Sequence, residues 1–141
     1  MPEESTVPYD LVQLTRAWLE AATSGDLDRA LSFLSPDPIW DMSPMGLGVF
    51  KGLAAVRGFY EDWMGAYQDY SIEPEDIYDL GNGVTCCVIL QQGRPLGSGG
   101  TVQLRYGSCA VWVGGKAAHV WNYPDIDEAR AAAERLAEGQ G

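Results

Sequence analysis

The chain has 141 residues, of which 46% are hydrophobic and 11% are aromatic, so it is long enough to bury one sizeable core. We therefore expect a single domain over residues 1–141. Twenty acidic and nine basic residues give a formal net charge of −11, and no segment gathers lysine or arginine into a patch that could neutralise phosphates. This balance argues against nucleic acid and against a membrane as partners.

The start of the sequence shows no basic stretch followed by an apolar run, and nowhere does an apolar run reach the roughly 18 residues of a membrane-spanning helix. A cytoplasmic location is therefore expected. The three cysteines, Cys86, Cys87 and Cys109, match neither a disulfide framework nor a zinc site with paired spacing. We expect them to be reduced, buried, small apolar side chains, and we expect no bound metal.

Helical periodicity dominates the first half of the chain. Over residues 9–22, apolar side chains recur at three- and four-residue steps, which places them on one helical stripe. Asp26 is placed to cap a short second helix, and residues 38–42 have the pattern of a short strand. A second short extended piece at residues 49–50 leads to a third helix after Gly52, which is the most aromatic of the predicted helices.

After Asp69 the pattern changes to an alternation with period two, which is typical of half-buried strands. The predicted strands are residues 70–73, 77–78, 84–90, 101–106, 109–113 and 117–123. Gly114-Gly115 predicts a tight turn before the last strand, and Asp125 and Glu128 have capping-box spacing at the start of a closing helix. This order predicts an α+β fold with helices packed on one face of a curved antiparallel sheet.

Several of these fragments, taken in order, resemble the SnoaL-like branch of the nuclear transport factor 2-like superfamily over about residues 9–137. They are Gly25-Asp26, Pro38 to Met42, Phe50-Lys51-Gly52, Ala110 to Lys116, and Tyr123-Pro124-Asp125 followed by Glu128-Ala129. The resemblance implies a cone-shaped fold, with helices on the concave face of the sheet and a ligand pocket between them. The superfamily includes ketosteroid isomerases, limonene epoxide hydrolases, polyketide cyclases and non-catalytic binding modules, so the fold alone leaves the chemistry open.

The last predicted strand supplies the first candidate residue. Strand alternation places Val120 and Asn122 on one face and His119 on the other. The resemblance to the epoxide hydrolase branch puts a catalytic carboxylate at the position of Asn122, which makes this the pocket face. Asn122 can donate a hydrogen bond to a substrate oxygen, but it cannot act as a general base. Residues 85–89 also lack the charged pair of that mechanism, so epoxide hydrolysis of this type is not expected.

Asp41 is the candidate general base. The resemblance to ketosteroid isomerases implies a carboxylate at the end of the first strand, where Asp41 lies. An ungapped comparison aligns that base with Met42, so Asp41 points into the pocket only if a bulge or register shift turns it. Otherwise Trp40 and Met42 line the pocket, and Asp41 faces solvent or a partner subunit.

His119 and Arg105 each have two interpretations. His119 is the only histidine, and an imidazole titrates near neutrality as a catalytic base should. Its strand face also carries Trp121 and Tyr123, however, and Trp112 can join them from the neighbouring strand. Such an aromatic face indicates burial against a second copy of the chain, so we predict a homodimer interface there. Arg105, if it points inward, needs an acidic partner or an anionic ligand.

Aromatic and thioether residues of the helices and the first strand predict an apolar pocket. The set is Trp18, Trp40, Met42, Phe50, Tyr60, Trp63 and Met64, with Arg105 and Val120 as further substrate-binding candidates. Such a pocket suits a flat polycyclic or terpenoid ligand. We therefore expect a cofactor-independent enzyme of the isomerase or cyclase type that removes a proton next to a carbonyl. In it, Asp41 is the base, Asn122 the oxyanion donor, and Tyr60 or Arg105 an auxiliary donor. A non-catalytic ligand-binding or dimerisation module of the same fold is the alternative.

Overall fold

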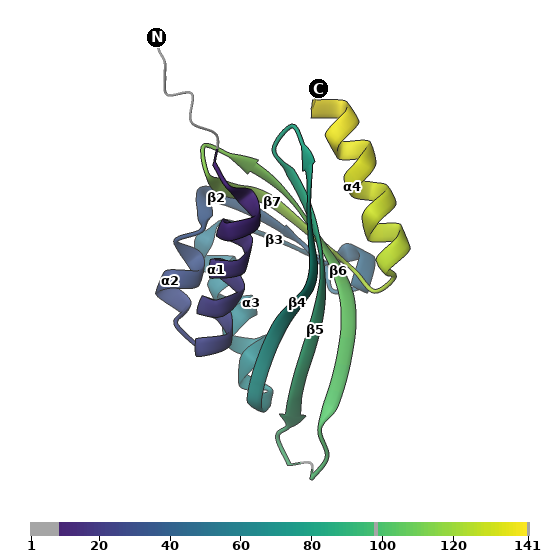
Figure 1. Ribbon diagram of the computed structural model, residues 1–141. Coiled ribbons are helices and arrows are strands. Elements are labelled where there is room, and N and C mark those ends of the chain that lie inside the picture. The colour runs from purple at the N-terminus through teal and green to yellow at the C-terminus, as the bar shows by residue number, and fades with distance from the viewer. Residues whose placement is uncertain (1–8, 98, 141) are drawn as a thin grey trace.

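The computed structural model describes residues 9–97 and 99–140. The elements are α1 (Leu11–Ser24), α2 (Leu27–Leu31), β2 (Leu34–Asp41), the 3₁₀ helix η1 (Ser43–Met45), β3 (Val49–Lys51), α3 (Leu53–Gly65), β4 (Tyr67–Gly81), β5 (Val84–Pro95), β6 (Val102–Val113), β7 (Lys116–Tyr123) and α4 (Ile126–Gln140). Figure 1 shows one curved sheet with helices against it, which confirms the predicted α+β class. In the described part of the chain, no helix combines the length and the apolar character needed to span a membrane.

The strands form one six-stranded sheet in the order β3-β2-β7-β6-β5-β4. The consecutive strands β4 to β7 pair antiparallel, whereas β2 runs parallel to β7, with Trp40 beside Val120 and Asp41 beside Trp121. The sheet is therefore mixed, and not purely antiparallel as expected. The parallel pairing brings the first described strand next to the last one, although most of the chain separates them.

Helices α1, α2 and α3 cover the concave face of the sheet (Figure 1). Trp18 of α1 meets Trp40 of β2 and Trp112 of β6 edge-on, with ring centroids 5.9 and 5.8 Å away. Edge-to-face aromatic pairs stabilise a core by about 0.5–1.5 kcal/mol beyond the area that they bury. The three indoles therefore fix the helical layer on the sheet.

The position of Trp112 corrects the sequence analysis, which placed this side chain on the outer face with His119. The pairing of β6 with β7 shifts register between Val111 and Trp112, where Ala118 of β7 is the extra residue, so Ala117 and its partner Trp112 face the side opposite to His119. The indole of Trp112 is 6% exposed and donates to Thr85 Oγ1 at 2.9 Å. Trp112 therefore belongs to the core.

Helix α4 lies on the opposite, convex face, over β5 and β6 (Figure 1). The sequence analysis expected helices on the concave face alone. The contact is made by small side chains, because Ala129, Ala133 and Ala137 pack against Cys86 and Cys109. Small residues on both sides allow the helix to approach the strands closely.

Aspartates cap three helices. Asp26 accepts a hydrogen bond from the backbone nitrogen of Arg29, and Asp125 from that of Glu128, both at 3.1 Å, so these two predicted caps are confirmed. Asp10 caps α1 in the same way. Each cap satisfies a backbone donor that the helix itself leaves free.

Several predicted strand boundaries are wrong, since β4 runs unbroken from Tyr67 to Gly81 and β5 continues to Pro95. β2 begins at Leu34, four positions before the predicted start at Pro38, and β6 runs without a break through Gly107 and Ser108. Glycine and serine interrupt the apolar alternation in the sequence, but Gly107 lies under α4, where a side chain has no room. The missing apolar residue therefore reflects close packing and not the end of a strand.

Gly107→Ala should lower the free energy of unfolding by about 1–3 kcal/mol, because overpacking a tight contact costs energy of this order. A Cβ atom at this position would lie 2.4 Å from the Cβ of Ala129 and would push α4 away from the sheet. Gly58→Ala in α3 is the matched control, since nothing lies within 4 Å of its new Cβ and alanine favours the helix. Urea denaturation measures both variants. A Gly107→Ala protein as stable as the parent would contradict the tight contact.

Candidate functional site

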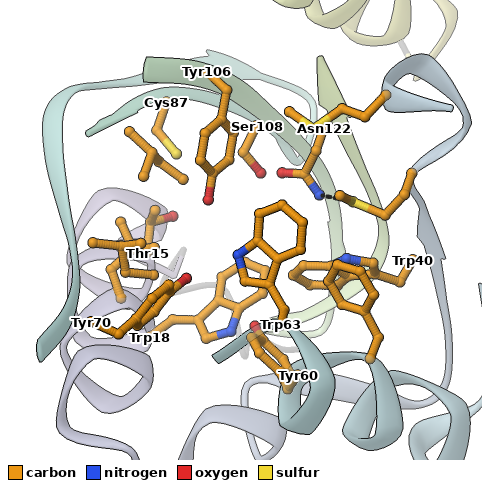
Figure 2. A pocket seen from close by; sticks show the side chains of 16 residues that line it. Thr15, Trp18, Trp40, Tyr60, Trp63, Tyr70, Cys87, Tyr106, Ser108 and Asn122 are labelled. Atoms are coloured by element: carbon orange, nitrogen blue, oxygen red, sulfur yellow. Dashed lines mark hydrogen bonds between the residues drawn. The ribbon is translucent and has the colours of Figure 1, made fainter. Parts of the chain in front are cut away.

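A cavity lies between the concave face of the sheet and helices α1 and α3 (Figure 2). Sixteen residues line it: the aromatic residues Trp18, Trp40, Phe59, Tyr60, Trp63, Tyr70 and Tyr106, the apolar residues Leu19, Met42, Met45, Ile72, Cys87 and Ile89, and the polar residues Thr15, Ser108 and Asn122. Its volume is about 50 Å³, which is room for a few water molecules. The cavity is thus a narrow space between ring faces.

None of these sixteen residues carries a carboxylate, an ammonium, a guanidinium or an imidazole group. Burial raises the pKa of the tyrosines Tyr60, Tyr70 and Tyr106 above the ordinary value, and it raises the pKa of the Cys87 thiol to about 12. All four groups are therefore neutral at pH 7. The cavity offers hydrogen bonds but no charge. Within the described residues, no three His, Cys, Asp or Glu side chains are grouped to hold a metal ion.

Three polar groups of the sheet meet at one end of the cavity (Figure 2): Tyr106 and Ser108 of β6, and Asn122 of β7. Ser108 and Asn122 are register partners. The Nδ2 atom of Asn122 donates to Met42 Sδ at 3.1 Å, and Figure 2 shows the amide oxygen on the side of Ser108. This end of the cavity therefore combines two hydroxyl groups with an amide oxygen and the second N–H of the amide.

The helical layer and the sheet each contribute a buried indole to the cavity lining, Trp18 from α1 and Trp40 from β2. The indole nitrogens of Trp18 and Trp40 are buried, and neither has a hydrogen-bond partner among the described residues. Figure 2 shows the Tyr60 hydroxyl close to the Trp18 ring. A buried donor without an acceptor costs about 1–3 kcal/mol. A ligand oxygen placed beside one of these groups would recover part of that cost.

Gln91 of β5 fixes two of the aromatic lining residues, Trp63 and Tyr70, by hydrogen bonds. Its side chain is buried, and its Oε1 atom accepts from Trp63 Nε1 at 2.8 Å and from the Tyr70 hydroxyl at 3.4 Å. Trp63 also stacks on Phe59, with ring centroids 5.5 Å apart and an interplanar angle of 25°. Contacts to β5 and within α3 thus fix the Trp63 ring. The sequence analysis missed Gln91, although a glutamine at an inward position of an apolar strand is a usable signal.

Most of the predicted ligand-binding residues do line the cavity. These are Trp18, Trp40, Met42, Tyr60 and Trp63, together with Asn122. Val120 shares the inner face but is 1% exposed and enclosed in the core. Phe50 and Met64 pack against the same core without reaching the lining. Ser108 was missed because the predicted strand ended before Gly107. Tyr106 was missed because the sequence analysis left open whether its face or that of Arg105 points inward.

Asp41 does not lie in the cavity, so this expectation is wrong. Its neighbour in β7 is Trp121, on the outer face, and the register of β2 with β3 and with β7 is regular from Ile39 to Asp41. No bulge turns the carboxylate inward. It accepts instead from the backbone nitrogen and the hydroxyl of Ser43, at 2.9 and 2.5 Å. The second alternative therefore holds, in which Trp40 and Met42 line the pocket.

Arg105 and His119 also lie outside the cavity. The Arg105 side chain is 54% exposed, and its guanidinium donates to both carboxylate oxygens of Glu75 at 2.7 and 2.8 Å. It is therefore a surface ion pair and not a buried cation. His119 stacks on Trp121, with ring centroids 3.5 Å apart, and desolvation lowers its pKa. Its Nε2 atom is buried without a partner among the described residues.

The family follows from a direct comparison. The sequence model of the SnoaL-like domain family matches residues 15–120. This stretch contains every residue that lines the cavity except Asn122. The chain belongs to the SnoaL-like domain family. This confirms the resemblance drawn from the sequence fragments. No curated protein sequence matches the chain significantly.

Solved structures share the fold of this SnoaL-like protein. A protein with a ketosteroid isomerase-like fold from Catenulispora acidiphila, in complex with trimethylamine, has a TM-score of 0.72 at 12% identity, over 86% of this chain and 92% of its own. SalBIII is described as an epoxide hydrolase/cyclase-like enzyme in the formation of the pyran ring of salinomycin. It has a TM-score of 0.70 at 15% identity, over 79% of this chain and 88% of its own. A Mycobacterium tuberculosis protein in complex with estradiol-17β-hemisuccinate has a TM-score of 0.69 at 14% identity, over 82% of this chain and 94% of its own. At these identities the likeness shows the fold alone.

Proposed function

We propose that this SnoaL-like protein binds a small, uncharged, hydrophobic carbonyl compound in the cavity. The observation that carries the proposal is the lining, in which seven of the sixteen residues are aromatic and none is charged. A charged ligand would lose its hydration without gaining an ionic partner. A flat apolar ring system gains from burial and from contact with the aromatic rings. The M. tuberculosis structure with estradiol-17β-hemisuccinate supports a polycyclic ring system as the apolar part of the ligand.

The polar groups of the cavity define where the oxygen atoms of such a ligand would sit. A carbonyl at one end can accept from the hydroxyls of Tyr106 and Ser108, and an oxygen at the other end from the indole nitrogen of Trp18. Both ends are separated by apolar and aromatic surface. The site therefore favours a ligand with oxygen atoms at opposite ends of an apolar ring system.

The size of the cavity means that the lining has to move when a ring system enters. The space of about 50 Å³ is far smaller than a polycyclic molecule, whose binding sites commonly measure on the order of 300–1,000 Å³. Phe59 and Trp63 of α3 are lining residues that are only partly buried. We place the entrance at these two rings, and the ligand between Trp63 and the sheet.

Trp63→Ala should raise the dissociation constant for polycyclic ketones by at least about tenfold, because the ligand loses the contact and burial against one aromatic ring. The readouts are quenching of tryptophan fluorescence and the rise in melting temperature on binding. Trp121→Ala is the matched control, since Trp121 is also a partly buried tryptophan but lies on the outer face. A folded Trp63→Ala protein that binds as tightly as the parent would place the site elsewhere.

Catalysis on the bound ligand is a second candidate function, as an isomerase or cyclase that needs no cofactor. The convergence of Tyr106, Ser108 and Asn122 favours it, because donors placed around a carbonyl oxygen stabilise the negative charge of an enolate. SalBIII, described as cyclase-like, shares the fold. The cavity has no carboxylate or imidazole, however, so the base predicted at Asp41 has no access to the ligand from where it lies.

If the protein is an enzyme, Asn122→Ala should slow proton exchange at the carbon next to the ligand carbonyl by about 10²–10³, the usual cost of losing an oxyanion donor. Asp41→Asn should leave this rate within about twofold, because its carboxylate lies outside the cavity, whereas loss of a general base costs about 10²–10⁴. Deuterium uptake followed by NMR measures both rates. A large loss in Asp41→Asn would return the base to Asp41. An inactive parent would leave binding as the function.

We also propose a homodimer through the outer face of β2, β3 and β7. Trp121, His119 and Tyr123 of β7 lie on this face, beside Ile39 of β2 and Val49 of β3. Val49 is 46% exposed, and the unpartnered Nε2 of His119 is buried beside the Trp121 ring. A second copy of the chain would cover these side chains by two-fold symmetry, with Asp41 and Lys51 of the same face next to them.

Trp121→Glu should convert the dimer to a monomer, because two carboxylates would be buried across the two-fold axis without partners. Leu96→Glu is the control, since Leu96 is 59% exposed at the other end of the sheet, in the turn after β5. Light scattering at micromolar concentration measures the mass of each protein. A monomeric parent, or a dimer that survives Trp121→Glu, would exclude this interface.

A further inference from the structure

We propose that Cys86 and Cys109 form an oxidation site, at which hydrogen peroxide converts the two thiols into a disulfide between β5 and β6. The two residues are direct register partners in neighbouring strands. Their sulfur atoms lie 4.0 Å apart. Both thiols are free, and the residues are 2% and 0% exposed. This inference is independent of the proposed ligand.

The position in the strand ladder suits a disulfide. At the end of the ladder, the backbone nitrogen of Trp112 donates to the carbonyl of Gly83 at 2.7 Å, and the register is regular from Val84 to Gly93. Gly83 and Trp112 are therefore a hydrogen-bonded pair. Because hydrogen-bonded and non-hydrogen-bonded pairs alternate along the ladder, Cys86 and Cys109, which are three pairs further on, form a non-hydrogen-bonded pair. In such pairs the Cα atoms are about 4.5 Å apart, which falls within the range of about 4.4–6.8 Å found for disulfides. The sulfurs can therefore meet by side-chain rotation.

The third cysteine provides an internal control. Cys87 follows Cys86 in the chain, so its side chain points to the other face of the sheet, where it lines the cavity. Its register partner is Ser108, and burial raises its pKa to about 12. Cys87 therefore has no thiol opposite it and should stay reduced.

Helix α4 covers the pair and controls access to it. The Cys109 thiol donates to the carbonyl oxygen of Ala129 at 2.9 Å, and the Ala133 and Ala137 side chains complete the cover. A transient separation of α4 from the sheet would admit a molecule as small as hydrogen peroxide. Because the proton of the Cys109 thiol is engaged by the Ala129 carbonyl, Cys86 is the thiol that ionises first.

The reaction is a two-electron oxidation with two steps. The Cys86 thiolate attacks one oxygen of hydrogen peroxide, the O–O bond breaks, and the released hydroxide takes a proton to become water, which leaves a sulfenic acid on Cys86. The Cys109 sulfur then attacks the sulfenic sulfur, and the S–O bond breaks. The proton of the Cys109 thiol leaves with the hydroxide as a second water. Two thiols and one peroxide thus give one disulfide and two waters.

The test treats the dilute, folded protein with hydrogen peroxide, removes the peroxide with catalase, unfolds the chain and labels the remaining thiols with N-ethylmaleimide. Mass spectrometry should show that the labels fall from three to one, since the chain has three cysteines. The mass of the chain itself should fall by two hydrogens. After proteolysis, the peptide that contains Cys86 should be found joined by a disulfide to the peptide that contains Cys109. In Cys87→Ser the labels should fall from two to none. In Cys86→Ala both remaining thiols should keep their labels. In Cys109→Ala no disulfide should form, and oxidation should stop at the sulfenic acid of Cys86, so one label is lost and the chain gains the mass of one oxygen.

Three results would overturn the proposal. The first is a folded parent or Cys87→Ser protein that keeps all its labels at a peroxide concentration that oxidises free cysteine in the same tube. The second is a disulfide that contains Cys87. The third is a bond between two chains and not within one. Circular dichroism before and after treatment shows that each protein was folded, and the parent and Cys87→Ser decide the outcome without the pair variants.

Discussion

The edge-on contact of Trp18 with Trp40 and Trp112 holds the two layers of this protein together. It joins helix α1 to strands β2 and β6, which have β7 between them in the sheet. One helical side chain therefore spans three strands of the curved face. Trp18 and Trp40 also line the cavity, while Trp112 closes the core behind them. The depth of the pocket is thus set by the same rings that attach the helices to the sheet.

The absence of charge in the cavity comes from the register of the strands and not from a shortage of charged residues in them. Asp41 follows Trp40 directly, and Arg105 precedes Tyr106. Because successive side chains of a strand point to opposite faces, an aromatic residue inside the cone puts its charged neighbour outside. Both charged groups are satisfied on that side, Asp41 by Ser43 and Arg105 by Glu75. The chemistry of the pocket therefore rests on neutral hydrogen-bonding groups.

The two faces of the sheet also carry different kinds of neutral surface. The concave face offers rings and hydroxyls to a ligand, whereas the convex face has small side chains under α4 and the partly buried ring of Trp121 beside them. The alternation that separates Cys86 from Cys87 assigns one thiol to each environment. Cys87 lies on the ligand side, and Cys86 meets Cys109 beneath the helix.

The sequence by itself determined the features that depend on near neighbours in the chain. Helical periodicity placed Trp18, Tyr60 and Trp63 toward the cavity, capping chemistry located Asp26 and Asp125, and the order of fragments identified the family. These features follow from the fixed geometry of one helix turn or one strand step.

The tertiary structure alone decided the features that depend on distant segments. The register shift that separates Trp112 from the face of His119 arises where β6 and β7 pair. The regular pairing of β2 with β3 and β7 kept Asp41 outside the cavity, and the close approach of α4 explains Gly107. No local pattern encodes them, because each results from which strand or helix lies alongside, and a shift of one residue in that pairing reverses the face on which a side chain falls.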